Sequence, residues 1–121
     1  MTSAPSDLRA VSDAAGHLAD AGEPVEPVLR VLSDPLRRRI VTLLAVEQLC
    51  TCHLVELTGA RQTNISNHLR VLREAGLVAA EPAGRFTYYR LMAGPLAALG
   101  EQLTDLAGRA ETAATRRRPC P

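Results

Sequence analysis

Apolar residues recur along the chain at helical spacing, in blocks that turn residues separate. Within residues 62–75, Ile65, Leu69 and Leu72 fall on one side of a helical wheel. The opposite side is polar and carries Thr63, Ser66, Asn67 and Arg70. Gly76 then ends the pattern. The spacing predicts an amphipathic helix with one buried face and one polar face.

A shorter helix is predicted just before it, over residues 52–58. Leu54 and Leu57 form its inward face. Thr51 is a suitable N-cap, and Gly59 suits the position after the last helical residue. A short helix, a tight turn and a longer polar-faced helix together outline a helix-turn-helix DNA reader.

Two further helices are predicted on the N-terminal side of this motif. The first covers residues 27–33, and its inward residues are Val28, Leu29 and Leu32. The second begins at Pro35, with Asp34 as its cap, and runs to about Ala45. Before them, residues 1–24 hold a sparse apolar stripe, which predicts an N-terminal arm or helix that either contacts a partner or frays.

Two strands are predicted after the motif, over residues 78–81 and 87–91. The connection over residues 82–86 contains a glycine and Arg85, as in a hairpin tip. A basic hairpin directly after a recognition helix is typical of a wing, and we expect Arg85 to contact phosphate or enter a minor groove.

The C-terminal part of the chain predicts a long helix over residues 94–115. Its apolar residues alternate at spacings of three and four: Leu96, Leu99, Leu103, Leu106 and Ala110. This seam covers about two heptads and indicates packing on a second copy, with packing inside one chain as the alternative. Residues 116–121 then form a flexible tail that carries Cys120.

These elements predict a mainly α protein with a small β-hairpin. The winged helix-turn-helix domain covers residues 25–93, and we expect dimerisation through the terminal helices. The 121 residues allow one domain with a modest aliphatic core, since the chain has one Phe and no Trp. Neither a secretory signal nor an apolar run long enough to cross a bilayer is evident, so we expect a cytoplasmic protein.

The net charge of +1 is unevenly distributed. Residues 1–34 hold two Arg against six Asp or Glu, whereas residues 35–90 hold eight Arg against four Glu. A basic region that coincides with a helix-turn-helix pattern favours DNA as the partner. The residues expected at the DNA are Gln62, Thr63, Asn64, Ser66, Asn67, His68, Arg70 and Arg85.

Two cysteines, Cys50 and Cys52, stand at the entrance of the first helix of the motif. In a cytoplasmic protein such thiols are more often metal-binding or redox-active than structural. On a regular helix, residues two apart point about 200° away from each other. Chelation of one ion by both therefore requires non-helical backbone around Thr51.

The chain resembles the arsenical-resistance repressor family, the ArsR/SmtB type of winged-helix metal sensors. The resemblance covers roughly residues 27–92 and consists of four segments in this order: LSDPLRRRIVTLL, LCTCHLVELTG, SNHLRVLREAGLV and GRFTYYRL. It implies a homodimeric repressor that binds an operator upstream of metal- or metalloid-resistance genes and leaves it when an inducer binds.

Within that family, a Cys-X-Cys pair at this place binds arsenite and antimonite in some members and cadmium, lead or zinc in others. Cys50 and Cys52 match the pair. Familiar arsenite sensors carry a third cysteine three residues later, where this chain has Val55. The chain also lacks both the N-terminal cysteines of the cadmium sensors and a histidine in its last helix, which zinc sensors use.

Arsenite is trivalent and suits three sulfur ligands, which soft ions prefer. We therefore expect a site for As(III) or Sb(III) made of Cys50, Cys52 and Cys120, from the same or the other subunit. Five extended residues after a helix ending near residue 115 span roughly 17 Å. His53 is the additional ligand that Cd(II), Pb(II) or Zn(II) would call for.

The expected mechanism is that inducer binding distorts or frays the first helix of the motif and so displaces the recognition helix. Three alternatives stay open: a thiol redox switch on the same fold, a small thiol oxidoreductase, and a structural metal site. The oxidoreductase is disfavoured because no Cys-X-X-Cys beside a strand-helix unit is present. We expect no catalytic activity and no required cofactor.

Overall fold

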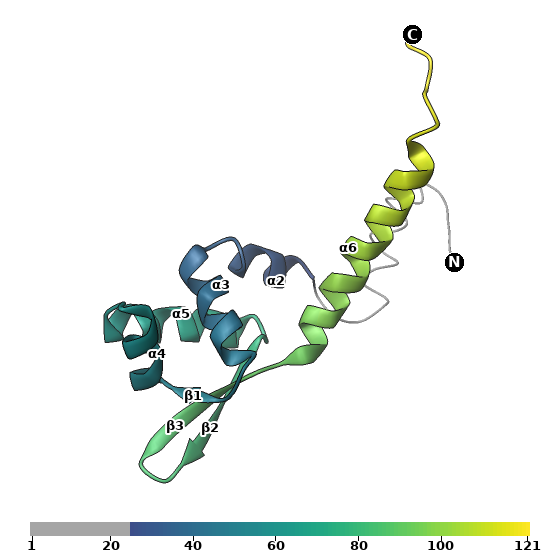
Figure 1. The fold of residues 1–121 in the computed structure, drawn as a ribbon. Helices are drawn as coiled ribbons and strands as arrows, with labels where there is room; N and C mark the ends of the chain where they lie inside the picture. Colours follow the sequence, from purple (N-terminus) through teal and green to yellow (C-terminus); the bar gives the residue numbers. More distant parts are fainter. Residues whose placement is uncertain (1–24) are drawn as a thin grey trace.

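The computed structural model describes residues 25–121, so the expected N-terminal arm over residues 1–24 lies outside the described residues. The helices and strands are α2 (Glu26–Val31), α3 (Pro35–Leu44), β1 (Leu49–Cys50), α4 (Thr51–Thr58), α5 (Gln62–Glu74), β2 (Val78–Ala83), β3 (Phe86–Leu91) and α6 (Ala93–Ala113). Figure 1 shows helices α2 to α5 gathered into one body, with the β2–β3 hairpin projecting from it. The fold is the predicted winged helix-turn-helix.

The apolar face predicted for α5 is the centre of the core. Ile65, Leu69 and Leu72 are each at most 1% exposed, and Leu54 of α4 is fully buried against the same cluster. Burying a side chain of this size contributes about 1.5–3 kcal/mol. This packing fixes the angle between the two helices of the DNA-reading motif.

Two apolar residues of the short helices were assigned to the wrong face. Leu29 of α2 is 50% exposed and Leu57 of α4 is 46% exposed. Val31 takes the buried position in α2 instead, at 7% exposure. Helices of six and eight residues make only about two turns, so their sequence pattern defines a face poorly.

The sheet contains a strand that was not predicted. Among the described residues, three antiparallel strands lie in the order β1-β3-β2, with Leu49 opposite Tyr89 and Cys50 opposite Tyr88. The wing, which is the hairpin of β2 and β3, closes through a two-residue turn between Ala83 and Phe86. Gly84 begins that turn at φ 65°, a conformation that glycine adopts without strain.

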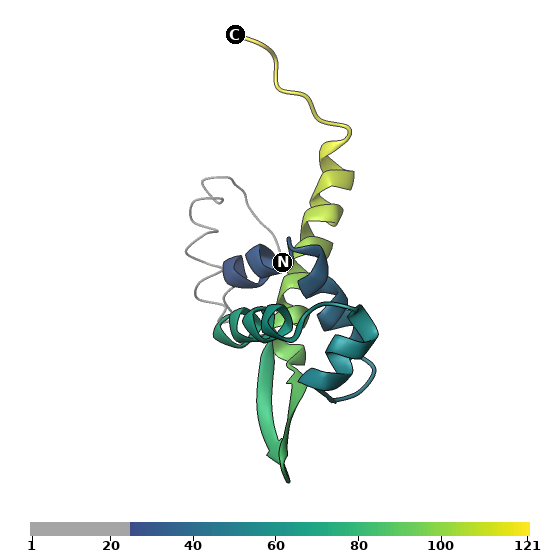
Figure 2. The same ribbon diagram turned by 90° about the vertical axis from the view of Figure 1, so that its left-hand side faces the viewer.

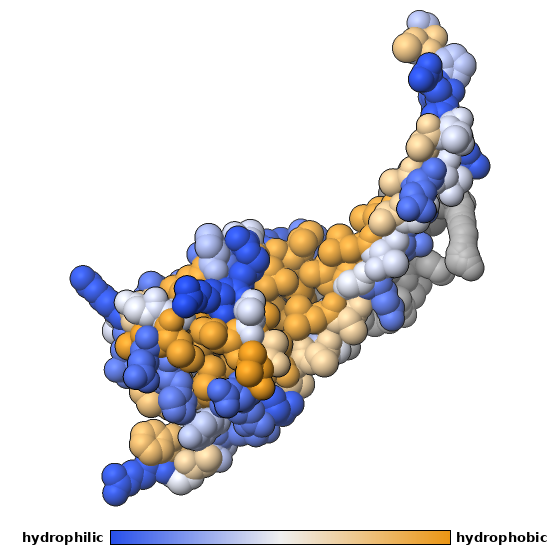
Figure 3. Space-filling view, viewed as in Figure 1, coloured by the Kyte–Doolittle hydropathy of each residue, from blue (hydrophilic) through white to orange (hydrophobic). Residues whose placement is uncertain are grey.

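Helix α6 leaves the body at the end of the wing and points away from it (Figures 1 and 2). Its first part packs on the core through Leu99, which is 7% exposed. Farther along, Leu103 and Leu106 are 52% and 53% exposed. Figure 3 shows the apolar surface continuing from the body onto this helix. None of the helices within residues 25–121 has the length and apolar character needed to cross a membrane.

Asp34 caps helix α3 as predicted, because its carboxylate accepts a hydrogen bond of 3.0 Å from the backbone N–H of Arg37. This hydrogen bond is the main cause that lowers the pKa of Asp34. A carboxyl group whose pKa is lowered by folding stabilises the fold above its unfolded pKa. That contribution is lost as the pH falls through the folded-state value.

We predict that Asp34→Ala lowers the free energy of unfolding by about 1 kcal/mol near neutral pH. The deficit should shrink below about pH 4, where the carboxyl group of the parent becomes protonated. Chemical denaturation at equal protein concentration measures both effects, with Asp34→Asn as the control that keeps a capping side chain. Equal stability of the parent and the alanine variant at pH 7 would contradict the assignment.

Candidate metal centre and nucleic-acid interface

Cys50 belongs to two elements at once, which determines where its sulfur points. It is the last residue of β1 and also the N-cap of α4, with extended backbone at φ −90° and ψ 172°. The helix therefore begins at Thr51, and the prediction of Thr51 as the N-cap was wrong by one residue. Chelation of one ion by both cysteines requires non-helical backbone, and this backbone lies at Cys50, directly before the helix.

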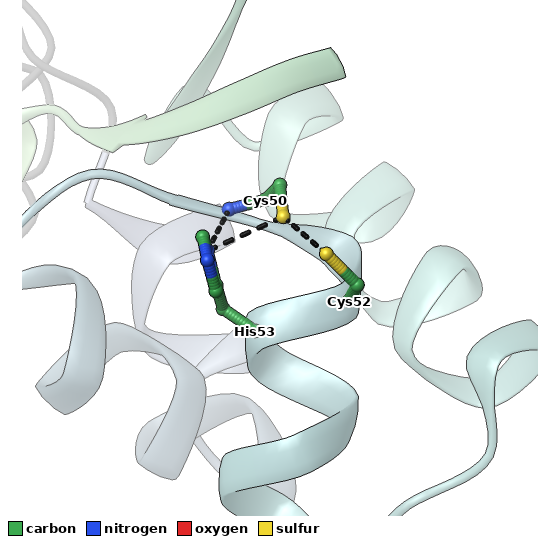
Figure 4. A group of neighbouring side chains, drawn as sticks. All are labelled: Cys50, Cys52 and His53. Atoms are coloured by element: carbon green, nitrogen blue, oxygen red, sulfur yellow. Dashed lines mark hydrogen bonds between the residues drawn. The ribbon is translucent and has the colours of Figure 1, made fainter. Parts of the chain in front are cut away.

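The extended residue brings the thiol pair, Cys50 and Cys52, together. Their Sγ atoms lie 2.6 Å apart, and the Nδ1 atom of His53 lies 3.2 Å from the Sγ of Cys50 (Figure 4). The ligand atoms of these three residues all lie within 4.8 Å of one another. Among residues 25–121, no other three His, Cys, Asp or Glu side chains meet in this way.

His53 also has a structural role. The side chain of Cys50 accepts from the backbone N–H of His53, and the Nδ1 atom of His53 accepts from the backbone N–H of Cys50 at 3.1 Å. The two residues thus form a capping box at the start of α4. Because Nδ1 has a single lone pair, coordination of an ion through this atom would break the second of these hydrogen bonds.

The two thiols differ in acidity. Burial raises the pKa of Cys50, but hydrogen bonds from Cys52 and from backbone N–H groups outweigh it, so the pKa of Cys50 is lowered. The pKa of Cys52 is raised, chiefly by its hydrogen bond to Cys50. Cys50 is 5% exposed, whereas Cys52 is exposed to solvent. The arrangement favours the thiolate form at Cys50 more than at Cys52, and thiolate is the form that binds soft ions.

The third cysteine lies apart from the pair. Cys120 is exposed on the tail after α6, which Figure 1 shows at the far end from the wing. Helix α6 has 21 residues and is therefore about 31 Å long. The seven residues that follow Ala113 span at most about 25 Å. The tail thus does not return along its own helix to the thiol pair of the same chain in this conformation.

The polar face predicted for DNA contact is exposed. The side chains of Gln62, Thr63, Asn64, Ser66, Asn67 and Arg70 all face solvent along α5. Arg85 is exposed at the tip of the wing. The structure therefore presents these residues on the two elements that a winged helix-turn-helix offers to a duplex.

His68 differs from the rest of that set. It is half-buried, and its Nδ1 atom lies 3.2 Å from the Nη1 atom of Arg37 on α3. Arg37 also donates through Nε to the backbone carbonyl of Val31, at 2.8 Å. The contact ties the recognition helix α5 to α3 and, through Arg37, to the end of α2, so His68 has a positioning role. Its DNA contact stays a prediction.

Two further arginines near the start of α3 donate hydrogen bonds to neighbouring helices. Arg38 donates to the carbonyl of Leu32 at 2.7 Å, and Arg39 donates to the carbonyl of Leu57 at 2.9 Å. Both acceptors lie near the C-terminal ends of other helices, where backbone carbonyls lack partners within the helix. The sequence carries no signal for these two hydrogen bonds, because the accepting carbonyls belong to other helices.

The fold and the exposed polar helix define a protein of the winged helix-turn-helix class with a thiol cluster at the first helix of its motif. Residues 34–80 match the profile of the family "bacterial regulatory protein, arsR family". A solved structure described as a "possible transcriptional regulator for arsenical resistance" is 42% identical, with a TM-score of 0.59, covering 64% of this chain and 81% of that one. The chain belongs to the arsR family.

Curated relatives agree with this family. The arsenic resistance transcriptional regulator ArsR1 of Pseudomonas putida is 39% identical over 77 residues, which cover 63% of this chain and 59% of that protein. The HTH-type transcriptional repressor SmtB of Mycobacterium tuberculosis is 39% identical over 83 residues, which cover 69% of this chain and 54% of that protein. The chain thus spans a little over half of each relative. Both relatives are named as transcriptional regulators, not as enzymes.

We predict that Cys52→Ala raises the pKa of Cys50, because it removes the S–H donor that stabilises the Cys50 thiolate. Thiolate absorbance near 240 nm, followed during a pH titration, measures this pKa in a background that carries Cys120→Ser. Cys52→Ser is the matched control, since its hydroxyl group keeps a donor at the same place. An unchanged or lowered Cys50 pKa in the alanine variant would refute the proposed hydrogen bond.

Proposed function

We propose that this protein is a transcriptional repressor that binds a palindromic operator as a homodimer and leaves it when As(III) or Sb(III) binds to Cys50 and Cys52. The observation that carries the proposal is the convergence of two sulfurs at the N-terminus of the first helix of the DNA-reading motif. Family membership and the names of two relatives support the DNA-binding role and the metalloid.

The chemistry of the pair suits a trivalent metalloid. Each As–S bond forms as a thiol loses its proton and arsenous acid, As(OH)3, loses a hydroxyl group, so that one water leaves per bond. The pair therefore releases two waters and leaves one hydroxyl on the arsenic. A third thiol displaces that hydroxyl as a third water by giving up its proton, and Cys120 of the partner subunit is our proposed donor. Three sulfur ligands match the preference of this soft centre.

The trigger that we propose is the loss of the cap of α4. The Sγ of Cys50 accepts the backbone N–H of His53, and an ion bound to that sulfur competes for the same electron pairs. Removing an N-cap interaction costs about 0.5–2 kcal/mol. A dimer has two such caps, so the summed cost of losing both falls near the coupling free energy of about 1–3 kcal/mol that is typical of allostery. The expected distortion of the first helix thus begins at its first turn.

Dimerisation through α6 is part of the proposal. Leu103 and Leu106 continue the apolar surface away from the body and are more than half exposed in one chain. A second copy packed along this stripe would cover them and hold two recognition helices at a fixed spacing. Such spacing is what a palindromic operator requires.

A second candidate function is a response to Cd(II), Pb(II) or Zn(II). It is favoured by the Nδ1 atom of His53, which adds a nitrogen to the two sulfurs. Borderline ions accept such mixed ligands, and tetrahedral coordination would then need a fourth donor. An ion bound to both the Cys50 sulfur and this nitrogen would break both hydrogen bonds of the capping box. Redox switching by a Cys50–Cys52 disulfide is the other alternative, favoured by the short distance between the sulfurs.

We predict that arsenite releases the parent protein from its operator, and that Cys50→Ser and Cys52→Ser each abolish the release while leaving DNA binding intact. Cys120→Ser should weaken the response if the tail supplies the third sulfur. Fluorescence anisotropy of a labelled duplex under reducing conditions measures release by arsenite, antimonite, cadmium, lead and zinc in turn. Arsenite release that persists in the Cys50→Ser/Cys52→Ser variant would refute the proposal, and release only by peroxide would favour the redox switch.

We predict that Leu103→Asp together with Leu106→Asp makes the protein monomeric, because two carboxylates would be buried in the apolar seam. Analytical ultracentrifugation measures the mass in solution. The matched control is Ala97→Asp with Thr112→Asp, which places the same charges on the other side of α6 and should remain dimeric. A dimer that survives the leucine replacements would show that α6 is not the interface.

A further inference from the structure

The thiol pair lines a groove that is formed by several elements together. The groove has a volume of about 340 Å³. It is lined by Cys50 and Cys52, by Gln62 at the start of α5, and by Arg85, Phe86 and Tyr89 of the wing. Three separate elements of the DNA-reading domain therefore meet around the two sulfurs.

Two of these residues belong to the surface expected to contact DNA. Gln62 is the first residue of the recognition helix and is exposed. Arg85 is exposed at the wing tip and also lines the groove. A duplex that holds α5 in its major groove and contacts the wing with its backbone must cross from one to the other. The mouth of the groove then lies beneath the duplex.

The two sulfurs differ in their access to solvent. Cys50 is almost fully buried, and its backbone is paired to Tyr88 of β3. Cys52 is the exposed member of the pair and lines the groove. An ion that approaches the pair from solvent through this groove meets the Sγ of Cys52 first.

We propose that bound DNA closes this groove, so that the inducer binds only to repressor that is free of DNA. This inference rests on the proposed function and adds how the site is regulated. Inducer and operator then compete for one face of the protein, and no long-lived complex holds both. The inducer then captures repressor that has dissociated spontaneously, and the proposed loss of the α4 cap keeps that repressor from binding DNA again.

The first test measures how fast the cysteines react with N-ethylmaleimide in the dimer, with and without a duplex that the protein selects from a randomised pool. At about 90% occupancy we expect modification of Cys52 to slow about tenfold, because only the free fraction reacts. Cys120 serves as the internal control, since no arsenite is present to bring it to the thiol pair and its tail lies at the far end of α6 from the wing. Mass spectrometry of the digested protein reports each cysteine separately.

The second test is kinetic and uses arsenite itself. A labelled duplex is chased with an excess of unlabelled duplex while arsenite is varied over a hundredfold range. The release rate should stay equal to the spontaneous rate at every arsenite concentration, as it should in Cys50→Ser/Cys52→Ser, which retains DNA binding but lacks the site. A rate that rises with arsenite in the parent alone would demonstrate a ternary complex and overturn the inference.

The remaining outcomes are also decisive. Unchanged Cys52 reactivity on a duplex that is demonstrably bound overturns groove closure but leaves the repressor proposal standing. Equal slowing at Cys52 and Cys120 overturns it too, because protection would not be specific to the groove. Failure to select any duplex overturns this inference and the proposed function together.

Discussion

The whole arrangement depends on the extended backbone of one residue, Cys50. This residue ends a strand that pairs with the wing and caps the helix that begins the DNA-reading motif. A residue in helical conformation would direct its side chain about 200° away from that of Cys52. Because Cys50 is extended, the two sulfurs meet without any distortion of the helix. The thiol pair and the geometry of the helix-turn-helix motif therefore depend on the same backbone position.

Because one residue serves both purposes, an ion bound at its sulfur would also act on the helix-turn-helix motif. The sulfur of Cys50 is a capping group, so its electron pairs already stabilise the start of α4. Helix α4 in turn packs through Leu54 on the buried face of the recognition helix. Under the proposed function, an ion at the sulfurs would act on the first turn of α4, and the shared core would transmit the change to α5. Such an ion would need no separate relay between distant sites, because the groove beside the sulfurs is also lined by α5 and the wing.

Much of the fold could be predicted from the sequence, because the longest amphipathic helix has an unambiguous period and strong end signals. The recognition helix, its buried face and the wing were all predicted. The strand at Leu49 was missed because two residues carry no alternation, and only pairing with a distant strand defines them. The role of Arg37 was missed for a similar reason, since its acceptors are a distant carbonyl and a histidine 31 residues away. The position of Cys120 depends on the direction of α6, which chain length alone does not determine.

The most direct measurement is X-ray absorption at the arsenic edge of the arsenite-loaded dimer. If Cys50 and Cys52 hold the metalloid, arsenic in the parent protein will show two or three sulfur neighbours. The Cys50→Ser/Cys52→Ser protein will then show at most the single sulfur that Cys120 can offer. An unchanged sulfur shell in that variant would mean that the metalloid binds elsewhere, and the thiol pair would not be the sensor.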